Sequence, residues 1–102
     1  MKKKENQMKK IVETLYLTPE ERAALKCKGL TALLGERVTL FCVNYIYTGK
    51  LIGVNDDCVL LENAGIVYET GELNNKSWKD CQSLPNNWYV STQSIESFGV
   101  LK

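Results

Sequence analysis

Apolar residues recur at strand-like spacing through the chain from residue 36 onward. Runs rich in β-branched and aromatic residues alternate with short polar or glycine-containing links, which is the pattern of short strands joined by tight turns. The links at 44–45 and 55–57 are too short for a crossover connection, so we expect the first three strands to form an antiparallel meander. The pattern predicts five strands, at residues 36–44, 46–55, 58–70, 87–92 and 94–100.

Two of these strands carry features that bear on the shape of the sheet. Gly49 and Gly53 lie inside the second strand, where glycine is typical of a bend or bulge, so we expect this strand to curl sharply. The first strand is largely apolar on both of its alternating faces over residues 38–43, so we expect both faces to be covered. The sequence therefore predicts a mostly β (α+β) fold, a small bent five-stranded antiparallel barrel with an N-terminal helix.

The predicted helix lies at residues 18–29. Thr18 and Glu21 have the spacing of a capping box, and Gly29 is suited to end the helix. A short second helical turn is expected at residues 30–34.

Residues 71–86 interrupt the strand pattern between the third and fourth strands, so we treat them as an insertion. Asn75 or Ser77 is placed to cap a short helix that would carry Trp78 and Cys81. We therefore predict a short helix within this insertion.

Length and composition set the domain organisation. The chain has 102 residues, 44% of them hydrophobic, which is enough to bury one core. We expect a basic arm and lead-in at 1–17 and a single domain at 18–102 that includes the insertion. No apolar run is long enough to cross a bilayer, and the N-terminal lysines are not followed by the apolar stretch of a secretory signal. We therefore expect a cytoplasmic protein with no membrane association.

Charge is distributed unevenly along the chain. Residues 1–10 hold five lysines and one glutamate, a balance of +4, whereas the net charge of the whole chain is only +1. The remaining residues therefore carry a balance of −3. The basic character belongs to the arm, and the folded body is mildly acidic, which is not typical of a domain whose own surface follows phosphates.

The residue types needed for most catalytic and metal sites are missing or scattered. The chain has no histidine, and its four cysteines contain no Cys-x-x-Cys pair, so neither an imidazole base nor a structural zinc site is indicated. In a reducing compartment we expect Cys42 and Cys58 to behave as small apolar core residues. We therefore expect a protein that is not an enzyme and that uses no cofactor.

The order of these elements resembles the Sm and LSm family, which includes the bacterial RNA chaperone of the Hfq type. The sequence VTLFCVN (38–44) is similar to the first strand of Hfq-type proteins, and GKLIGVNDDCVLLEN (49–63) keeps the length and apolar pattern of the second and third. NWYVSTQSIESFG (87–99) is similar to the second Sm motif, in which a strand, a tight loop and a final strand with an isoleucine follow one another.

The resemblance implies a closed homo-oligomeric ring, of roughly five to seven subunits, in which the fourth strand of one subunit pairs with the fifth of the next. An exposed Trp-Tyr-Val edge is an aggregation liability in a monomer, and ring closure would cover it. The ring-interface residues implied in this way are Trp88, Tyr89, Val90, Ile95 and Phe98.

The resemblance also implies that two loops line the pore and hold RNA, yet this chain departs from the family in both. The first loop reads Asn55-Asp56-Asp57 and the second Thr92-Gln93-Ser94, without the usual aromatic or cationic groups. Asn55-Asp56-Asp57 is first of all turn chemistry, and Asp56 and Asp57 are only weak candidates for a metal site. The candidate nucleic-acid-binding residues are Lys2, Lys3, Lys4, Lys9, Lys10, Asn55, Asp57, Thr92, Gln93 and Ser94.

Two functions follow as expectations. The first is an Sm-like ring that binds RNA or another single-stranded nucleic acid through its arm, its aromatic residues and its neutral pore loop. The alternative is a ring-shaped assembly or ligand-sequestering scaffold that does not bind nucleic acid and whose specific surface is the 71–86 insertion.

Overall fold

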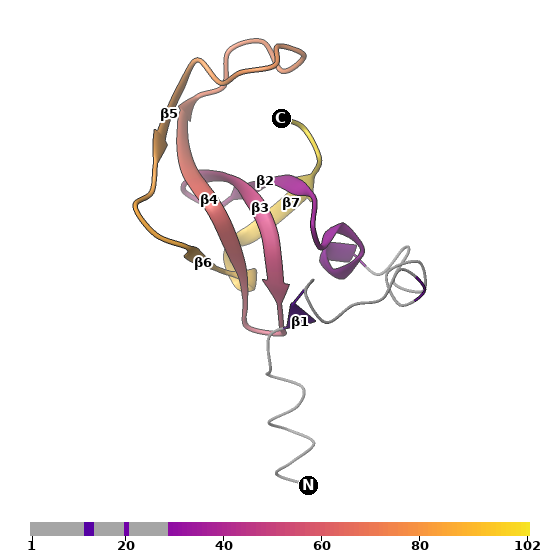
Figure 1. Cartoon of the computed structure of the whole chain (residues 1–102). Coiled ribbons are helices and arrows are strands. Elements are labelled where there is room, and N and C mark those ends of the chain that lie inside the picture. The colour runs from indigo at the N-terminus through magenta and orange to yellow at the C-terminus, as the bar shows by residue number, and fades with distance from the viewer. Residues whose placement is uncertain (1–11, 14–19, 21–28) are drawn as a thin grey trace, which may run out of the picture.

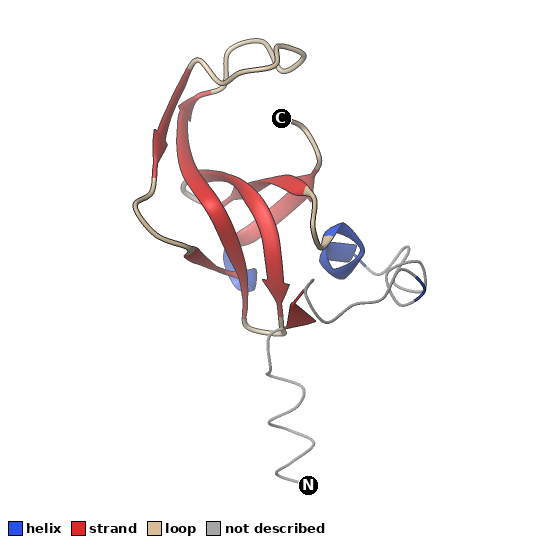
Figure 2. Cartoon of the chain, viewed as in Figure 1, coloured by secondary structure: helices blue, strands red, loops and turns tan. Residues whose placement is uncertain are grey.

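The computed structural model describes residues 12–13, 20 and 29–102, and these form a small, mostly β domain. Figure 1 traces the chain, and Figure 2 shows that strands make up most of the described part. In chain order the elements are β1 (Val12–Glu13), η2 (Gly29–Leu33), β2 (Arg37–Cys42), β3 (Ile46–Val54), β4 (Cys58–Glu69), β5 (Asp80–Ser83), β6 (Trp88–Ser91), η3 (Thr92–Ser94) and β7 (Ile95–Gly99).

All strand pairs belong to one antiparallel sheet. Its order is β5-β4-β3-β2-β7, with β6 also paired to β4 and the two-residue β1 paired to β3. The predicted meander is confirmed, because β2 pairs with β3 and β3 with β4 in antiparallel registers. The five predicted strands correspond to β2, β3, β4, β6 and β7, and the predicted turn at 30–34 is the 3-10 turn η2.

Two sequence-based expectations are wrong, and a third concerns residues that lie mostly outside the described part of the chain. The predicted short helix in the 71–86 insertion is wrong, because Asp80–Ser83 forms β5 and pairs with β4. The barrel is not closed: the sheet is bent but open, since β6 and β7 each pair with another strand and not with each other. The predicted helix 18–29 lies outside the described residues apart from Glu20 and Gly29, as do the arm and lead-in 1–17 apart from β1.

β5 forms along the part of the long strand β4 that β6 does not reach. β4 spans 12 residues, and its first half pairs with β6 through Cys58↔Ser91 to Leu61↔Trp88. The second half would present unpaired backbone N–H and C=O groups along the same edge, and β5 supplies partners for them from Gly65 to Glu69. This long-range pairing overrides the local helical signal.

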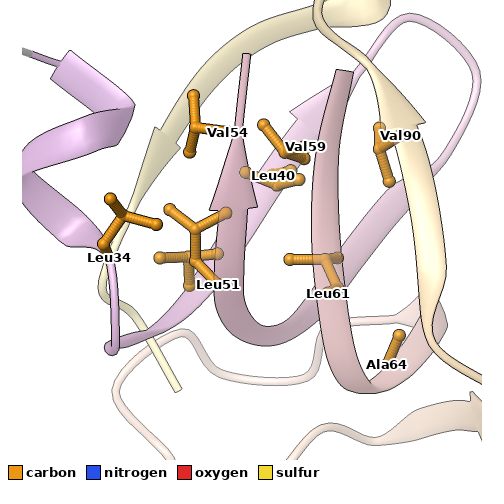
Figure 3. Packing of buried hydrophobic residues seen from close by; sticks show 9 residues of the cluster. Leu34, Leu40, Leu51, Val54, Val59, Leu61, Ala64 and Val90 are labelled. Carbon is orange, nitrogen blue, oxygen red and sulfur yellow. The ribbon is translucent and has the colours of Figure 1, made fainter. Parts of the chain in front are cut away.

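The hydrophobic core lies on one face of the bent sheet. Figure 3 shows its side chains pointing toward one another from η2's end and from the central strands. Its members are Leu34, Val38, Leu40, Leu51, Val54, Val59, Leu61, Ala64 and Val90. Burial of aliphatic side chains of this kind is the main favourable term in the folding free energy of the domain.

The opposite face of β2 is covered as well, as the pattern predicted. Thr39 and Thr48 are cross-strand partners, and both are fully buried. Successive side chains in a strand point to opposite faces, so these threonines lie on the side away from Val38 and Leu40. Thr48 Oγ1 donates a hydrogen bond of 3.3 Å to the backbone oxygen of Lys102, so the last described residues return to this face.

Gly49, the first of the two glycines in β3, is required by close backbone approach. The β3–β4 register shifts between Thr48 and Lys50, opposite an irregular stretch of β4, which confirms the predicted bulge. A Cβ atom added at Gly49 would lie 3.0 Å from Leu61 Cβ and 3.2 Å from Ala64 Cα. Both neighbours belong to the packed core and have little room to move.

We therefore expect Gly49→Ala to lower the free energy of unfolding by about 1–3 kcal/mol, the usual cost of overpacking a core. The matched control is Gly99→Ala in β7, where an added Cβ would meet nothing within 4 Å. Urea denaturation followed by circular dichroism compares the two variants with wild type. Equal unfolding midpoints for Gly49→Ala and Gly99→Ala would contradict this account of the bulge.

Candidate functional site

The two loops singled out in the sequence lie together at one end of the sheet. β4 begins at Cys58, directly opposite Ser91 at the end of β6, so the 55–57 turn meets the turn that follows β6. The Thr92 backbone N–H donates to Asp57 O at 3.0 Å, and Thr92 Oγ1 donates to Asp56 O at 2.8 Å. We call Asn55–Asp57 and Thr92–Ser94 the loop pair.

Asn55 has a structural role in the first of these loops. Its Oδ1 accepts hydrogen bonds from the backbone N–H groups of Asp57 and Cys58, both at 2.8 Å, and its own N–H donates to Cys58 O at 3.0 Å. Asparagine favours tight turns because its side chain can bond to nearby backbone groups in this way. The turn interpretation of Asn55 is thus supported, whereas the side chains of Asp56 and Asp57 are exposed.

We expect Asn55→Ala to lower the free energy of unfolding by about 0.5–1.5 kcal/mol, because two backbone N–H groups, one exposed and one part-buried, lose their protein acceptor. Asp57→Asn is the matched control and should change stability by less than about 0.5 kcal/mol, since an exposed carboxylate in a turn contributes little. Thermal melts of both variants provide the measurement. A larger loss in Asp57→Asn than in Asn55→Ala would show that the carboxylate has a role beyond the turn.

The second loop also uses most of its polar groups within the chain. Ser94 Oγ donates to Ser91 O at 2.9 Å, and Ser94 O accepts from the Val43 backbone N–H at 2.9 Å. Together with the Thr92 bonds, these contacts fix the shape of η3. Gln93, at the middle of η3, has an exposed side chain.

The exposed groups of the loop pair are therefore two carboxylates and one amide, from Asp56, Asp57 and Gln93. Carboxylates accept hydrogen bonds from amines and repel phosphate, so the loop pair is suited to donors or cations and not to a nucleic-acid backbone. Among residues 29–102 no group of three or more acidic, cysteine or histidine side chains is arranged to hold a metal ion.

Two cysteines of the sheet have perturbed thiols. Burial raises the pKa of the Cys42 thiol, a hydrogen bond with Ser94 lowers it in part, and Glu96 adds to the rise. Burial likewise raises the pKa of Cys81, with Arg37 lowering it and Asp80 raising it. Because the thiolate is the reactive form, neither residue is activated as a nucleophile. Cys42 packs against the core, as predicted.

The outer edges of β6 and β7 form the second candidate surface. Within the described part of the chain β6 pairs only with β4 and β7 only with β2, so each strand has one edge without a strand partner. Trp88, Tyr89 and Phe98 are 37%, 61% and 41% exposed, which leaves three aromatic side chains on these two strands open to solvent.

The five residues assigned to the ring interface thus divide into two groups. Trp88, Tyr89 and Phe98 are available to a partner, whereas Val90 is 4% exposed and lies in the core of its own chain. Ile95 is half-buried against the same core. The side chains of Val90 and Ile95 therefore hold the strands in place within their own chain.

The candidate residues Lys2, Lys3, Lys4, Lys9 and Lys10 lie outside the described residues.

Searches against protein-family models, curated proteins and solved structures find no match for this chain. None of the helices in the part that the structure describes has the length and apolar character needed to cross a membrane.

Proposed function

We propose that the chain assembles into a closed homo-oligomeric ring of the Sm type, in which the β6 edge of one subunit pairs with the β7 edge of the next. The observation that carries the proposal is the strand order. β7 is the outer strand beyond β2, and β6 lies outside the first half of β4 while β5 lies outside its second half. β6 and β7 are joined to each other by the three-residue turn η3.

Chemistry at the two edges supports this assembly. Unpaired strand edges with exposed aromatic side chains favour pairing with another chain, and a closed ring removes such edges altogether. Tyr89 on β6 and Phe98 on β7 supply apolar area of the type that anchors protein interfaces. Because the two edges differ, the contact is head-to-tail, which is the arrangement that generates rings.

The ligand we propose is single-stranded RNA, held chiefly by the N-terminal arms. The arm carries a balance of +4 over its first ten residues, and a ring would multiply this charge by the number of subunits. The exposed carboxylates of the loop pair are unsuited to phosphate. In this proposal the loop pair contacts base edges through its hydrogen-bond acceptors. The proposal that RNA is the ligand rests on the family resemblance together with the charge of the arm.

A scaffold that binds no nucleic acid is the second candidate, and one observation favours it. Asp56 and Asp57 are exposed beside Gln93, so the loop pair lacks the cations with which nucleic-acid-binding loops hold phosphate. In such a scaffold the partner would be a protein or a small cationic ligand.

A fluorescence-anisotropy titration distinguishes the two candidates. Labelled single-stranded RNA and a duplex of the same sequence are titrated with the full chain at about 50 and about 200 mM salt. The RNA proposal expects preferential binding of the single strand, with an affinity that falls as salt rises. No binding of either RNA at the lower salt concentration would overturn it in favour of the scaffold.

A further inference from the structure

The loop between β4 and β5 converges on one lysine side chain. Lys102 Nζ donates hydrogen bonds to three backbone oxygens, of Thr70 at 3.0 Å, Glu72 at 2.8 Å and Ser77 at 3.1 Å. The same nitrogen lies 4.5 Å from the centroid of the Trp78 ring. We call Thr70, Glu72, Ser77 and Trp78 the ammonium cage.

The cage matches the chemistry of a primary ammonium group. An –NH₃⁺ group has three N–H donors, and the three carbonyls accept all of them. The face of the Trp78 ring adds a cation–π attraction, which is strongest for the indole ring. A guanidinium group is planar and a quaternary ammonium group has no N–H, so neither can make the same set of contacts.

The loop has few other contacts that would fix it. The Asn75 N–H donates to Glu72 O at 3.1 Å, Thr70 Oγ1 donates to Gly71 O at 2.9 Å, and Gly71 adopts a positive φ of 67°. Most other side chains of residues 71–77 are exposed. Carbonyl dipoles that point at one position repel one another unless a cation lies there, so the bound ammonium holds the loop in this shape.

Lys102 is held at its backbone as well as at its side chain. Its backbone oxygen accepts the 3.3 Å hydrogen bond from Thr48 Oγ1 on the buried face of β3. Occupation of the cage therefore also keeps the segment at 100–102 over the Thr39 and Thr48 face. Figure 1 shows this end of the chain returning toward the loop that connects β4 and β5.

We propose that residues 70–78 form a binding site for primary alkylammonium groups, of the kind carried by lysine side chains, and that Lys102 is its ligand in cis. Loss of the ammonium from Lys102 by substitution opens the cage to an ammonium from outside the chain. The site lies on the loop between β4 and β5 and does not depend on the proposed ring or on RNA.

The test compares wild type, Lys102→Met and the matched control Lys76→Met, which removes an exposed lysine from the same loop. Hydrogen exchange of peptides covering residues 70–79 is measured by mass spectrometry, with and without n-butylammonium chloride or tetramethylammonium chloride at equal ionic strength. Lys102→Met should exchange about tenfold faster than wild type over this segment, because charged hydrogen bonds that close the loop are lost. Lys76→Met should exchange as wild type does.

n-Butylammonium should restore slow exchange in Lys102→Met in a saturable manner, tetramethylammonium should not, and wild type should respond to neither because its cage is filled. Trp78 emission in a Trp88→Phe background should follow the same titration. Wild-type exchange rates in Lys102→Met would overturn the claim that the Lys102 ammonium holds the loop in place. Equal effects of the two ammonium salts would overturn the selectivity of the cage for N–H donors.

Discussion

Tyr89→Asp is expected to convert the assembled protein into monomers and small oligomers. Tyr89 is 61% exposed on the outer strand β6, and in the proposed ring its side chain is buried against the next subunit. Burying an unpaired carboxylate in an interface costs several kcal/mol, and truncation of an aromatic anchor costs about 2 kcal/mol or more. Because every subunit of a ring carries the substitution, the association free energy is lowered at every subunit interface.

The matched control is Tyr68→Asp. Tyr68 is 53% exposed, close to the value for Tyr89, but it lies on β4, whose two edges are occupied by β3 on one side and by β5 and β6 on the other. Sedimentation velocity should show Tyr68→Asp at the wild-type size and Tyr89→Asp at a smaller one. If both variants keep the wild-type size, the β6 edge is not part of the assembly.

A second substitution identifies the partner edge. Phe98→Asp on β7 should disrupt the ring as strongly as Tyr89→Asp, because the proposed contact joins β6 of one subunit to β7 of the next. A mixture of the two variants still offers one intact combination, the β6 edge of Phe98→Asp with the β7 edge of Tyr89→Asp. The mixture should therefore form heterodimers but no closed rings. Wild-type assembly by Phe98→Asp alone would indicate a symmetric β6–β6 contact instead.

Deletion of residues 2–10 is expected to weaken binding of single-stranded RNA by about 100-fold or more at low salt, since each lysine that neutralises a phosphate releases a counterion. The dependence of affinity on salt should become correspondingly shallower. The deletion removes five lysines and one glutamate from every subunit. Anisotropy titrations at several salt concentrations give both the affinity and the slope.

Lys50→Gln is the control for this deletion, because Lys50 is an exposed lysine on β3, outside the arm. It should change the affinity only slightly. An unchanged salt slope after the deletion would assign the phosphate contacts to the folded domain and not to the arm.

Much of the strand arrangement followed from local patterns in the sequence. β2, β3 and β4 were predictable because alternation and tight links specify both the strands and their order, and Gly49 indicated the bulge. β5 was not predictable in the same way. Trp78 and Cys81 have helical spacing, and the reason for a strand at Asp80–Ser83 is the open edge of β4, which lies outside the local sequence.

The candidate sites differ in how far they could be predicted from the sequence. The resemblance implied that both loops line one pore, and the structure brings the 55–57 turn into contact with η3. The direction of Val90 into the core followed from its register with Val59, which only the sheet reveals. The ammonium cage left no signal at all, because three of its four contacts to Lys102 are backbone oxygens and the lysine lies far from them in sequence.

A native mass spectrum of the full chain, purified from cells under mild conditions, tests the central claim most directly. The account predicts a single dominant assembly whose protein mass is five to seven times the 11.6 kDa of one chain. It further predicts additional mass from RNA that is lost after nuclease treatment. A spectrum dominated by the 11.6 kDa monomer at micromolar concentration would contradict the ring and the functions proposed for it.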